Sequence, residues 1–206
     1  MPRQGGVVPK LYGRITLLPK YRVPEAIYGL DGFSHIWLLW DFSESHCDDE
    51  SGVWSPTVRP PRLGGNKRMG VFATRSPFRP NSIGLSVVKL EKIDFPDIYV
   101  SGVDLMDGTP IYDIKPYIPY ADCHEDAVGG YADRESGHRL DVVFPDEMLE
   151  LIPDEKRQAA SDCLADDPRP AYQNDPARIY SMAFAGFDIR FTIDGDVLRV
   201  TEVVRR

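Results

Sequence analysis

Short runs in which hydrophobic and polar residues alternate fill the first two thirds of the chain, and turn residues separate them. A period of two is typical of strands with one face toward a core. The run at 35–40, His-Ile-Trp-Leu-Leu-Trp, is too apolar for this and predicts a strand buried on both faces. Strands are thus predicted at 12–18, 35–40, 69–74, 85–93, 98–105 and 111–114, with a hairpin turn at 94–97 and a helical turn at 24–30.

The last third of the chain has a different pattern. Residues 121–137 are polar and contain Gly129-Gly130, which predicts a loop. After a strand at 139–144, helices are predicted at 146–151 and 154–165, with Asp154 as the N-cap of the second. Strands at 179–185, 187–193 and 197–204 complete the chain. The fold class is therefore mainly β, with a barrel or sandwich at 1–140 and a small α+β domain at 141–206.

The composition excludes several classes of protein. No apolar run approaches the ~20 residues that cross a bilayer, and the first residues lack the apolar core of a signal peptide. The 3 cysteines are not closely paired, so no disulfide framework is predicted. We expect a cytoplasmic protein with no membrane partner.

The charges are unevenly distributed. The net charge of −8 argues against a nucleic-acid partner. Residues 51–90, however, contain no Asp or Glu and seven basic residues: Arg59, Arg62, Lys67, Arg68, Arg75, Arg79 and Lys89. Local potential rather than net charge attracts a phosphate or a carboxylate, so this segment predicts an anion-binding face. The alternative is that these residues point to several sides of the fold.

Proline and glycine stiffen the same segment. Two proline-bearing turns, at 59–62 and 75–81, fix the backbone beside arginines. Guanidinium groups held in this way suit carboxylates and phosphates, although solvated arginines on a structural loop remain an alternative. No dinucleotide-binding or P-loop motif is present. No zinc-protease motif or paired C-x-x-C occurs either, so no metal site is expected.

Longer strings identify a resemblance. The string RMGVFATRSPFRPNSIGLS at 68–86 resembles the signature of the TrmO/TsaA-like family. Other matching strings lie at 2–4, 32–35, 57–62, 107–117 and 167–172, so the resemblance covers nearly the whole chain. It implies a single-sheeted β-barrel methyltransferase domain, a small C-terminal domain and a homodimer. It also implies S-adenosylmethionine as cofactor and, as reaction, methylation of N6 of threonylcarbamoyladenosine at position 37 of tRNA.

The resemblance also implies site residues. The cofactor contacts carried over are Pro2, Arg3, Gln4, Ser43, Glu44, Arg75, Leu85, Asp107, Gly108, Thr109 and Pro110. Candidate contacts to the tRNA or to the carboxylate of its modified base are Arg59, Arg62, Arg79, Arg169 and Tyr172. Asp107 is alternatively a turn residue that stabilises its own backbone, and Phe78 is a second candidate for stacking on a base. No catalytic base is identified.

This sequence departs from the family pattern at three places. Pro2 follows Met1 directly, Ser82 stands where proline is usual, and Ser43-Glu44 stands where some relatives have His-Gln. Two other functions remain open alternatives: a non-catalytic regulator that binds S-adenosylmethionine or RNA, and a methyltransferase that acts on a small molecule.

Overall fold

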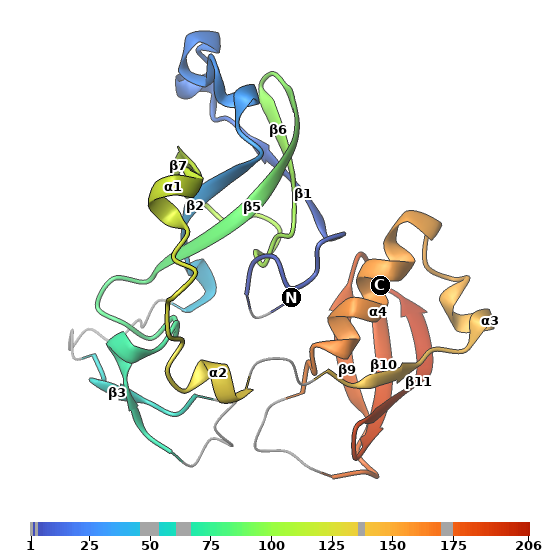
Figure 1. The fold of residues 1–206 in the computed structure, drawn as a ribbon. Coiled ribbons are helices and arrows are strands. Elements are labelled where there is room, and N and C mark those ends of the chain that lie inside the picture. Colours follow the sequence, from blue (N-terminus) through green and yellow to red (C-terminus); the bar gives the residue numbers. More distant parts are fainter. Residues whose placement is uncertain (1, 3, 46–53, 61–66, 136–138, 170–174) are drawn as a thin grey trace.

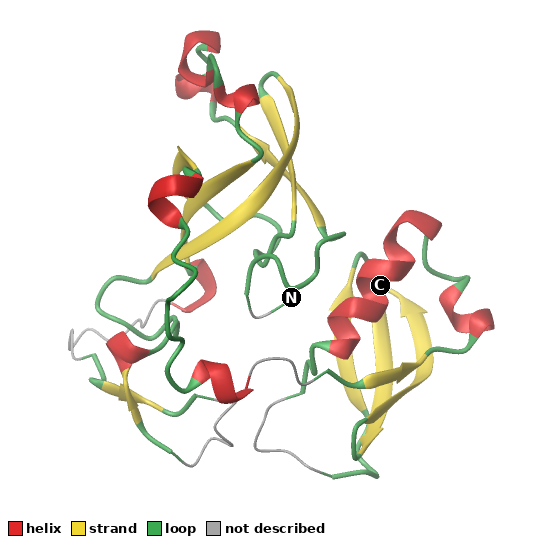
Figure 2. Cartoon of the chain, in the orientation of Figure 1, coloured by secondary structure: helices red, strands yellow, loops and turns green. Residues whose placement is uncertain are grey.

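Two β-sheets dominate the computed structural model, which describes residues 2, 4–45, 54–60, 67–135, 139–169 and 175–206 (Figure 1). The first is a five-stranded antiparallel sheet in the order β1-β6-β5-β2-β7. Its strands are β1 (Tyr12–Thr16), β2 (His35–Asp41), β5 (Ile83–Asp94), β6 (Asp97–Ser101) and β7 (Ile111–Pro116). Figure 2 shows strands as the main element of both halves of the molecule, which agrees with the mainly β class that the sequence predicts.

Alternate residues of the first sheet form its core. Ile36, Leu38 and Trp40 of β2 are buried, and Ile36 pairs with the buried Val88 of β5. The intervening residues of β2 are only partly buried, so the prediction of a strand buried on both faces is wrong. The outer face of β2 is covered only in part, for example where Asp122 of α1 (Pro119–Asp122) accepts a hydrogen bond of 3.0 Å from the indole of Trp37.

The first sheet is open in the described part of the chain. β1 and β7 are its two outer strands, and no pairing joins them. The closed barrel that the resemblance implies is therefore not confirmed. The sheet is nevertheless strongly twisted, and its strands cross one another at a visible angle (Figure 1), as expected for antiparallel strands of L-residues.

A small ribbon leaves the sheet between β2 and β5. β3 (Thr57–Val58) and β4 (Met69–Gly70) pair antiparallel, Thr57 with Gly70 and Val58 with Met69. The strand predicted at 69–74 is thus only two residues long, and β3 was not predicted at all. A 3-10 turn, Val71–Ala73, replaces the rest of it. Thr74 stabilises this turn, because its backbone N–H and its hydroxyl both donate to the carbonyl of Val71, at 3.1 and 2.8 Å.

The second sheet lies in the C-terminal part. It has the order β8-β11-β10-β9, with β8 parallel to β11 and the other pairs antiparallel. The strands are β8 (Asp141–Val143), β9 (Tyr180–Phe184), β10 (Phe187–Asp194) and β11 (Val197–Arg205). Two helices, α3 (Asp146–Leu149) and α4 (Asp154–Ala165), accompany it. α4 covers one face of the sheet (Figure 1) and buries Ala159, Ala160, Cys163 and Leu164 against it.

The N-terminal segment links the two sheets. Val8 is 1% exposed and belongs to the core cluster of the C-terminal sheet, although it is 132 positions from Leu140, the next member of that cluster along the chain. Leu11 packs against both core clusters. The apolar residues just before β1 therefore attach the first sheet to the second.

Two details of the C-terminal prediction need correction. Pro153, not Asp154, is the N-cap of α4, and no side chain caps that end. Pro153 has extended backbone angles, and Asp154 is already helical and forms an ion pair with Arg157 at 3.2 Å. The loop predicted at 121–137 contains a short helix, α2 (Ala132–Glu135), preceded by a hydrogen bond of 2.8 Å from the Gly129 N–H to the Asp133 carboxylate.

Candidate functional site

The residues that begin the chain lie against β5 at the point where β6 ends. The Gly6 N–H donates to the carbonyl of Gly102, just after β6, at 2.8 Å. A Cβ on Gly5 would lie 3.1 Å from the carbonyl oxygen of Val87 and 3.4 Å from Cβ of Ser86. These distances are tighter than most Cβ contacts, so the absence of a side chain at Gly5 favours this close backbone approach.

This approach brings two of the predicted site residues together. Arg75 Nη1 donates to Gln4 Oε1 at 2.5 Å, although the two residues are 71 positions apart. Arg75 is exposed. A guanidinium carries five N–H donors, so this contact leaves Arg75 able to bind an anion. Pro2 is buried beside this segment, and Arg3 lies outside the described residues.

An acidic residue that was not predicted lies beneath this contact. Asp104 Oδ1 accepts from the Ser86 hydroxyl at 2.6 Å, and that hydroxyl accepts from the Trp40 indole at 3.0 Å. The backbone N–H of Gly5 also contributes a hydrogen bond to Asp104. Burial raises the pKa of Asp104, and the bonds from Ser86 and Gly5 and the nearby charge of Arg75 only partly offset it. In the sequence, the signal for this buried network is Ser86, a polar residue at an inward-facing position of β5 whose neighbours on that face are apolar.

Trp40 holds its place in this network because Gly84 has no side chain. A Cβ on Gly84 would lie 2.2 Å from Cε2 of Trp40. The indole therefore lies directly on the backbone of β5, with its N–H toward Ser86. Phe42 packs on its other side, with ring centroids 4.3 Å apart. Gly84, a residue of the signature string, thus has a packing role.

Two other predicted segments meet at the end of β2. The N–H of Asp41 donates to the Pro110 carbonyl and the N–H of Phe42 to the Ser82 carbonyl, each at 3.0 Å. Ser43 and Glu44 follow in a 3-10 turn, both exposed. The hydrogen bond that the Tyr112 hydroxyl, in the neighbouring strand β7, donates to the Asp41 carboxylate is the largest of the effects that raise the pKa of Tyr112.

The fourth predicted segment, 107–110, forms a tight turn. The backbone N–H and the hydroxyl of Thr109 donate to the Met106 carbonyl at 3.2 and 2.8 Å. Gly108 has φ = +78°, a conformation that favours glycine. Asp107 is exposed in this turn.

The turn at 107–110 lines a groove of about 1630 Å³, which residues of β1 and β7 form together with residues of α4 and β9 from the C-terminal part. Leu11, Tyr12, Tyr28 and Tyr112 are among its lining residues, and several of these side chains are well exposed. Gln4, Arg75 and Leu85 do not line it. Leu85 is 52% exposed on β5, opposite Leu39 of β2. The structure therefore joins Gln4 to Arg75, and the 43–44 turn to Pro110, but does not place all candidates in one cavity.

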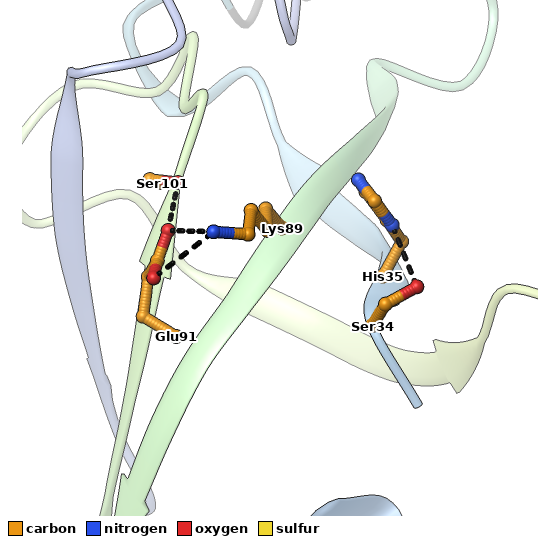
Figure 3. Close-up of polar contacts among 5 residues, drawn as sticks. All are labelled: Ser34, His35, Lys89, Glu91 and Ser101. Carbon is orange, nitrogen blue, oxygen red and sulfur yellow. Dashed lines mark hydrogen bonds and ion pairs between the residues drawn. The ribbon is translucent and has the colours of Figure 1, made fainter. Parts of the chain in front are cut away.

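The basic residues of 51–90 do not all form one face. Lys89 lies on β5 and its Nζ is 3.1 Å from Glu91 Oε1, which also accepts from the Ser101 hydroxyl at 2.6 Å (Figure 3). These two bonds lower the pKa of Glu91. His35, the cross-strand partner of Lys89 on β2, bonds Ser34 instead, with 3.0 Å between its Nδ1 and the Ser34 hydroxyl (Figure 3). Lys89 is thus neutralised and does not contribute to an anion-binding surface.

The predicted substrate residues differ in their surroundings. Arg59 is exposed just after β3. Arg79 is partly buried, and its Nη1 donates to the Thr74 carbonyl at 3.0 Å. The Arg169 side chain is only 14% exposed and pairs with Asp167 at 3.0 Å, so it stabilises its own loop. Arg62 and Tyr172 lie outside the described residues.

The described part of the chain shows neither a metal cluster nor a membrane-spanning helix. No group of three or more His, Cys, Asp or Glu side chains there could hold a metal ion. Within the same residues, no helix is both long and apolar enough to cross a membrane.

Known proteins resemble this chain over most of its length. The family model described as the tRNA-methyltransferase O N-terminal domain matches residues 1–123, and the TrmO C-terminal domain model matches residues 138–206. A tRNA (adenine(37)-N6)-methyltransferase of Escherichia coli K12 is 41% identical over 94% of this chain and 86% of its own length. A putative S-adenosylmethionine-dependent methyltransferase of Pseudomonas aeruginosa is 41% identical over 98% and 90%.

A solved structure agrees with these matches. The crystal structure of TrmO from P. aeruginosa aligns with a TM-score of 0.78 at 34% identity, covering all of this chain and 88% of that one. Both family models match in the expected order, and the signature string at 68–86 falls within the first. The chain belongs to the tRNA-methyltransferase O family.

Proposed function

We propose that this protein is an S-adenosylmethionine-dependent methyltransferase that acts on N6 of the adenosine at position 37 of tRNA. The similarity to relatives with that activity in their names supports the proposal. The observation that carries it in this structure is the contact between Gln4 and Arg75. It joins the first residues of the chain to the signature string and leaves an exposed guanidinium beside the partly buried carboxylate of Asp104.

The residues of this chain fit the cofactor. S-adenosylmethionine supplies a methyl group on a sulfonium centre and carries a carboxylate, an ammonium, a ribose diol and an adenine. Arg75 is suited to the carboxylate, since it is exposed and retains unused donors. Exposed Leu85 offers apolar contact, and Gly108 allows a ligand to approach the backbone. The proposed contacts are Pro2, Arg3, Gln4, Ser43, Glu44, Arg75, Leu85, Asp107, Gly108, Thr109 and Pro110.

The specific substrate proposed is N6-threonylcarbamoyladenosine. Its N6 is a ureido nitrogen, which is less nucleophilic than an amine but more acidic, so removal of its proton favours methyl transfer. The work of the protein is then mainly to position this nitrogen against the methyl group. The threonyl carboxylate requires a cationic partner, and Arg59 and Arg79 lie in a segment that has no acidic residue. No residue is assigned as the base.

The proposal includes an organisation of the chain. Residues 1–140 form the cofactor-binding domain, of the single-sheeted barrel type with a gap between β1 and β7, and residues 141–206 form the second domain. Two copies are proposed to associate as a homodimer. Exposed apolar side chains along the groove support an association there, among them Tyr12 at 62% and Tyr28 at 94% exposure.

The test is methyl transfer by the purified protein. Two tRNAs are compared, one with adenosine and one with threonylcarbamoyladenosine at position 37, and their nucleosides are analysed by mass spectrometry after incubation with S-adenosylmethionine. Methylation of the second tRNA alone supports the full proposal. Methylation of only the tRNA with unmodified adenosine would support position 37 as the target but refute threonylcarbamoyladenosine as the substrate. If neither tRNA is methylated while calorimetry detects cofactor binding, the protein is a regulator and the proposal fails.

A further inference from the structure

Two aromatic rings at one end of the β3–β4 ribbon are exposed. Phe72 is 72% exposed and Trp54 is 41% exposed, and their ring centroids are 5.7 Å apart with an interplanar angle of 41°. Neither ring belongs to the two hydrophobic core clusters. An exposed apolar patch with polar residues at its rim is typical of a binding surface.

The backbone fixes this outward orientation. The Val71 N–H donates to the Pro56 carbonyl at 2.9 Å, which continues the ribbon beyond its last strand pair. The Val71 side chain is 1% exposed, so the next residue, Phe72, points to solvent. On the opposite strand, the Ser55 hydroxyl donates to the Thr57 carbonyl at 2.8 Å, which tightens the turn that follows Trp54.

One cation lies beside the two rings, and two more lie at the other end of the ribbon. The guanidinium carbon of Arg79 lies 6.0 Å from the centroid of the Phe72 ring, and its Nη1 is anchored on the Thr74 carbonyl. At the other end of the ribbon, Arg59 follows β3 and Arg68 precedes β4, and both are exposed. The sequence from 51 to 90 itself contains no Asp or Glu.

We propose that Trp54, Phe72 and Arg79 form a platform on which unpaired bases of RNA stack, and that Arg59 and Arg68 bind phosphates of the same strand. Aromatic rings with flanking cations are the combination by which proteins hold single-stranded nucleic acids. A two-fold contact between copies of this chain would place the same patch, with its arginines, against itself, and like charges facing each other disfavour such a contact. The charge near these rings therefore favours RNA over a second copy of this chain.

The position of the platform relates it to the reaction. Phe72 is three residues before Arg75, the residue that contacts Gln4. The inference rests on the proposed function and adds the surface that would hold the unpaired nucleotides of the substrate loop. Stacking on an aromatic ring does not depend on the identity of the base, since every base has a π-face.

The first experiment measures the affinity for an anticodon stem-loop RNA that contains adenosine at position 37. Phe72→Ala and Trp54→Ala should each raise the dissociation constant by about tenfold, the effect of losing one stacked base. Phe72→Tyr, which keeps the ring, should retain the affinity of the original protein. The matched control is Tyr99→Ala, because Tyr99 also carries a cation over its ring, with Lys92 Nζ at 4.3 Å, but lies on β6.

The second experiment separates stacking from charge. Arg59→Ala and Arg68→Ala should each reduce the slope of log affinity against log salt concentration by about 0.7, whereas the two ring variants should leave the slope unchanged. Tryptophan fluorescence reports directly on stacking, because Trp54 is more exposed than Trp40, which is 8% exposed. The stem-loop should quench the fluorescence of the original protein, and Trp54→Phe should remove most of the quenching.

Three outcomes would count against these proposals, and they differ from one another. If the original protein does not bind the stem-loop at all, the proposed function fails together with the platform. If it binds, and both ring variants bind with the same affinity, the platform alone is refuted. If the ring variants keep their RNA affinity but change the molecular mass in solution, the surface is a contact between copies, which also refutes the platform.

Discussion

The two sheets use their hydrophobic residues in different ways. α4 covers the C-terminal sheet. In the core between them, Ile189, Phe191 and Leu198 are each 1% exposed or less. The N-terminal sheet has a smaller described core and leaves Tyr12, Leu85 and Tyr112 more than half exposed. It also places a polar network, Trp40–Ser86–Asp104, at the edge of that core. The C-terminal sheet thus supplies stability, whereas the N-terminal sheet keeps surface available for binding.

The largest expected effect comes from the core of the C-terminal sheet. Phe191→Ala should lower the free energy of unfolding by about 3–5 kcal/mol, because it removes a fully buried ring and leaves a cavity. Urea unfolding measures this loss. Affinity for S-adenosylmethionine, corrected for the folded fraction, should not change. A loss of cofactor affinity in the folded protein would show that the C-terminal core also contributes to binding.

Arg75 tests the proposed binding role of the N-terminal part. Arg75→Ala should weaken the binding of S-adenosylmethionine by about 1.5–3 kcal/mol, the range for a hydrogen bond to a charged group. Its exposed side chain contributes little to folding, so the melting temperature should be unchanged. Calorimetry and a thermal melt give the two values. Arg75→Lys, which keeps the charge without the fork, should lie in between; equal affinity in all three proteins would remove Arg75 from the site.

Replacing Asp104 is expected to change the free energy of unfolding by a smaller amount, which depends on pH. Its pKa is raised in the folded protein, because burial disfavours the charged form. The stability that protonated Asp104 contributes is therefore present below its unfolded pKa and is lost as pH rises through the folded value. Asp104→Asn should gain stability relative to the original protein between acidic and neutral pH, measured by urea unfolding at both. A difference that does not vary with pH would mean that Asp104 titrates as it does in the unfolded chain.

The smallest effect is expected on the solvent face of the C-terminal sheet. Arg190 Nη1 lies 2.6 Å from Glu202 Oε2, and both side chains are about half exposed, at 47% and 50%. A double-mutant cycle of Arg190→Ala and Glu202→Ala should give a coupling of about 0.2–1 kcal/mol, because water and salt screen an exposed pair. Thermal melts at low and high salt measure it. A coupling well above this range would show that stability in this sheet is not confined to its apolar core.

Local sequence determined much of the fold. The hairpin between β5 and β6, the helix α4 and the strands β9 to β11 lie close to their predicted positions, because apolar periodicity and turn residues act over a few residues. The same reasoning failed where distant packing decides. It could not show that the outer face of β2 is only partly covered. It also missed β3, whose two residues pair only because the 54–60 segment meets Gly70.

The candidate site shows the same limit. The strings that resemble the family identified Arg75, Gln4 and the 107–110 turn. Asp104 and Ser86 were not identified, since nothing local distinguishes an acid that will be buried from one that stays in water. Trp54 and Phe72 were likewise missed, because a sequence does not state whether a ring in an apolar string enters a core.

The sequence by itself therefore determined the family, the mainly β class, the acid-free basic segment and most of the elements. Tertiary structure alone decided that Gln4 meets Arg75, that Glu91 neutralises Lys89, and that Val8 packs into the C-terminal core. The physical reason is the range of the interactions. Backbone propensity and turn chemistry act between near neighbours in the chain, whereas burial and charge pairing depend on which distant segments the folded chain brings into contact.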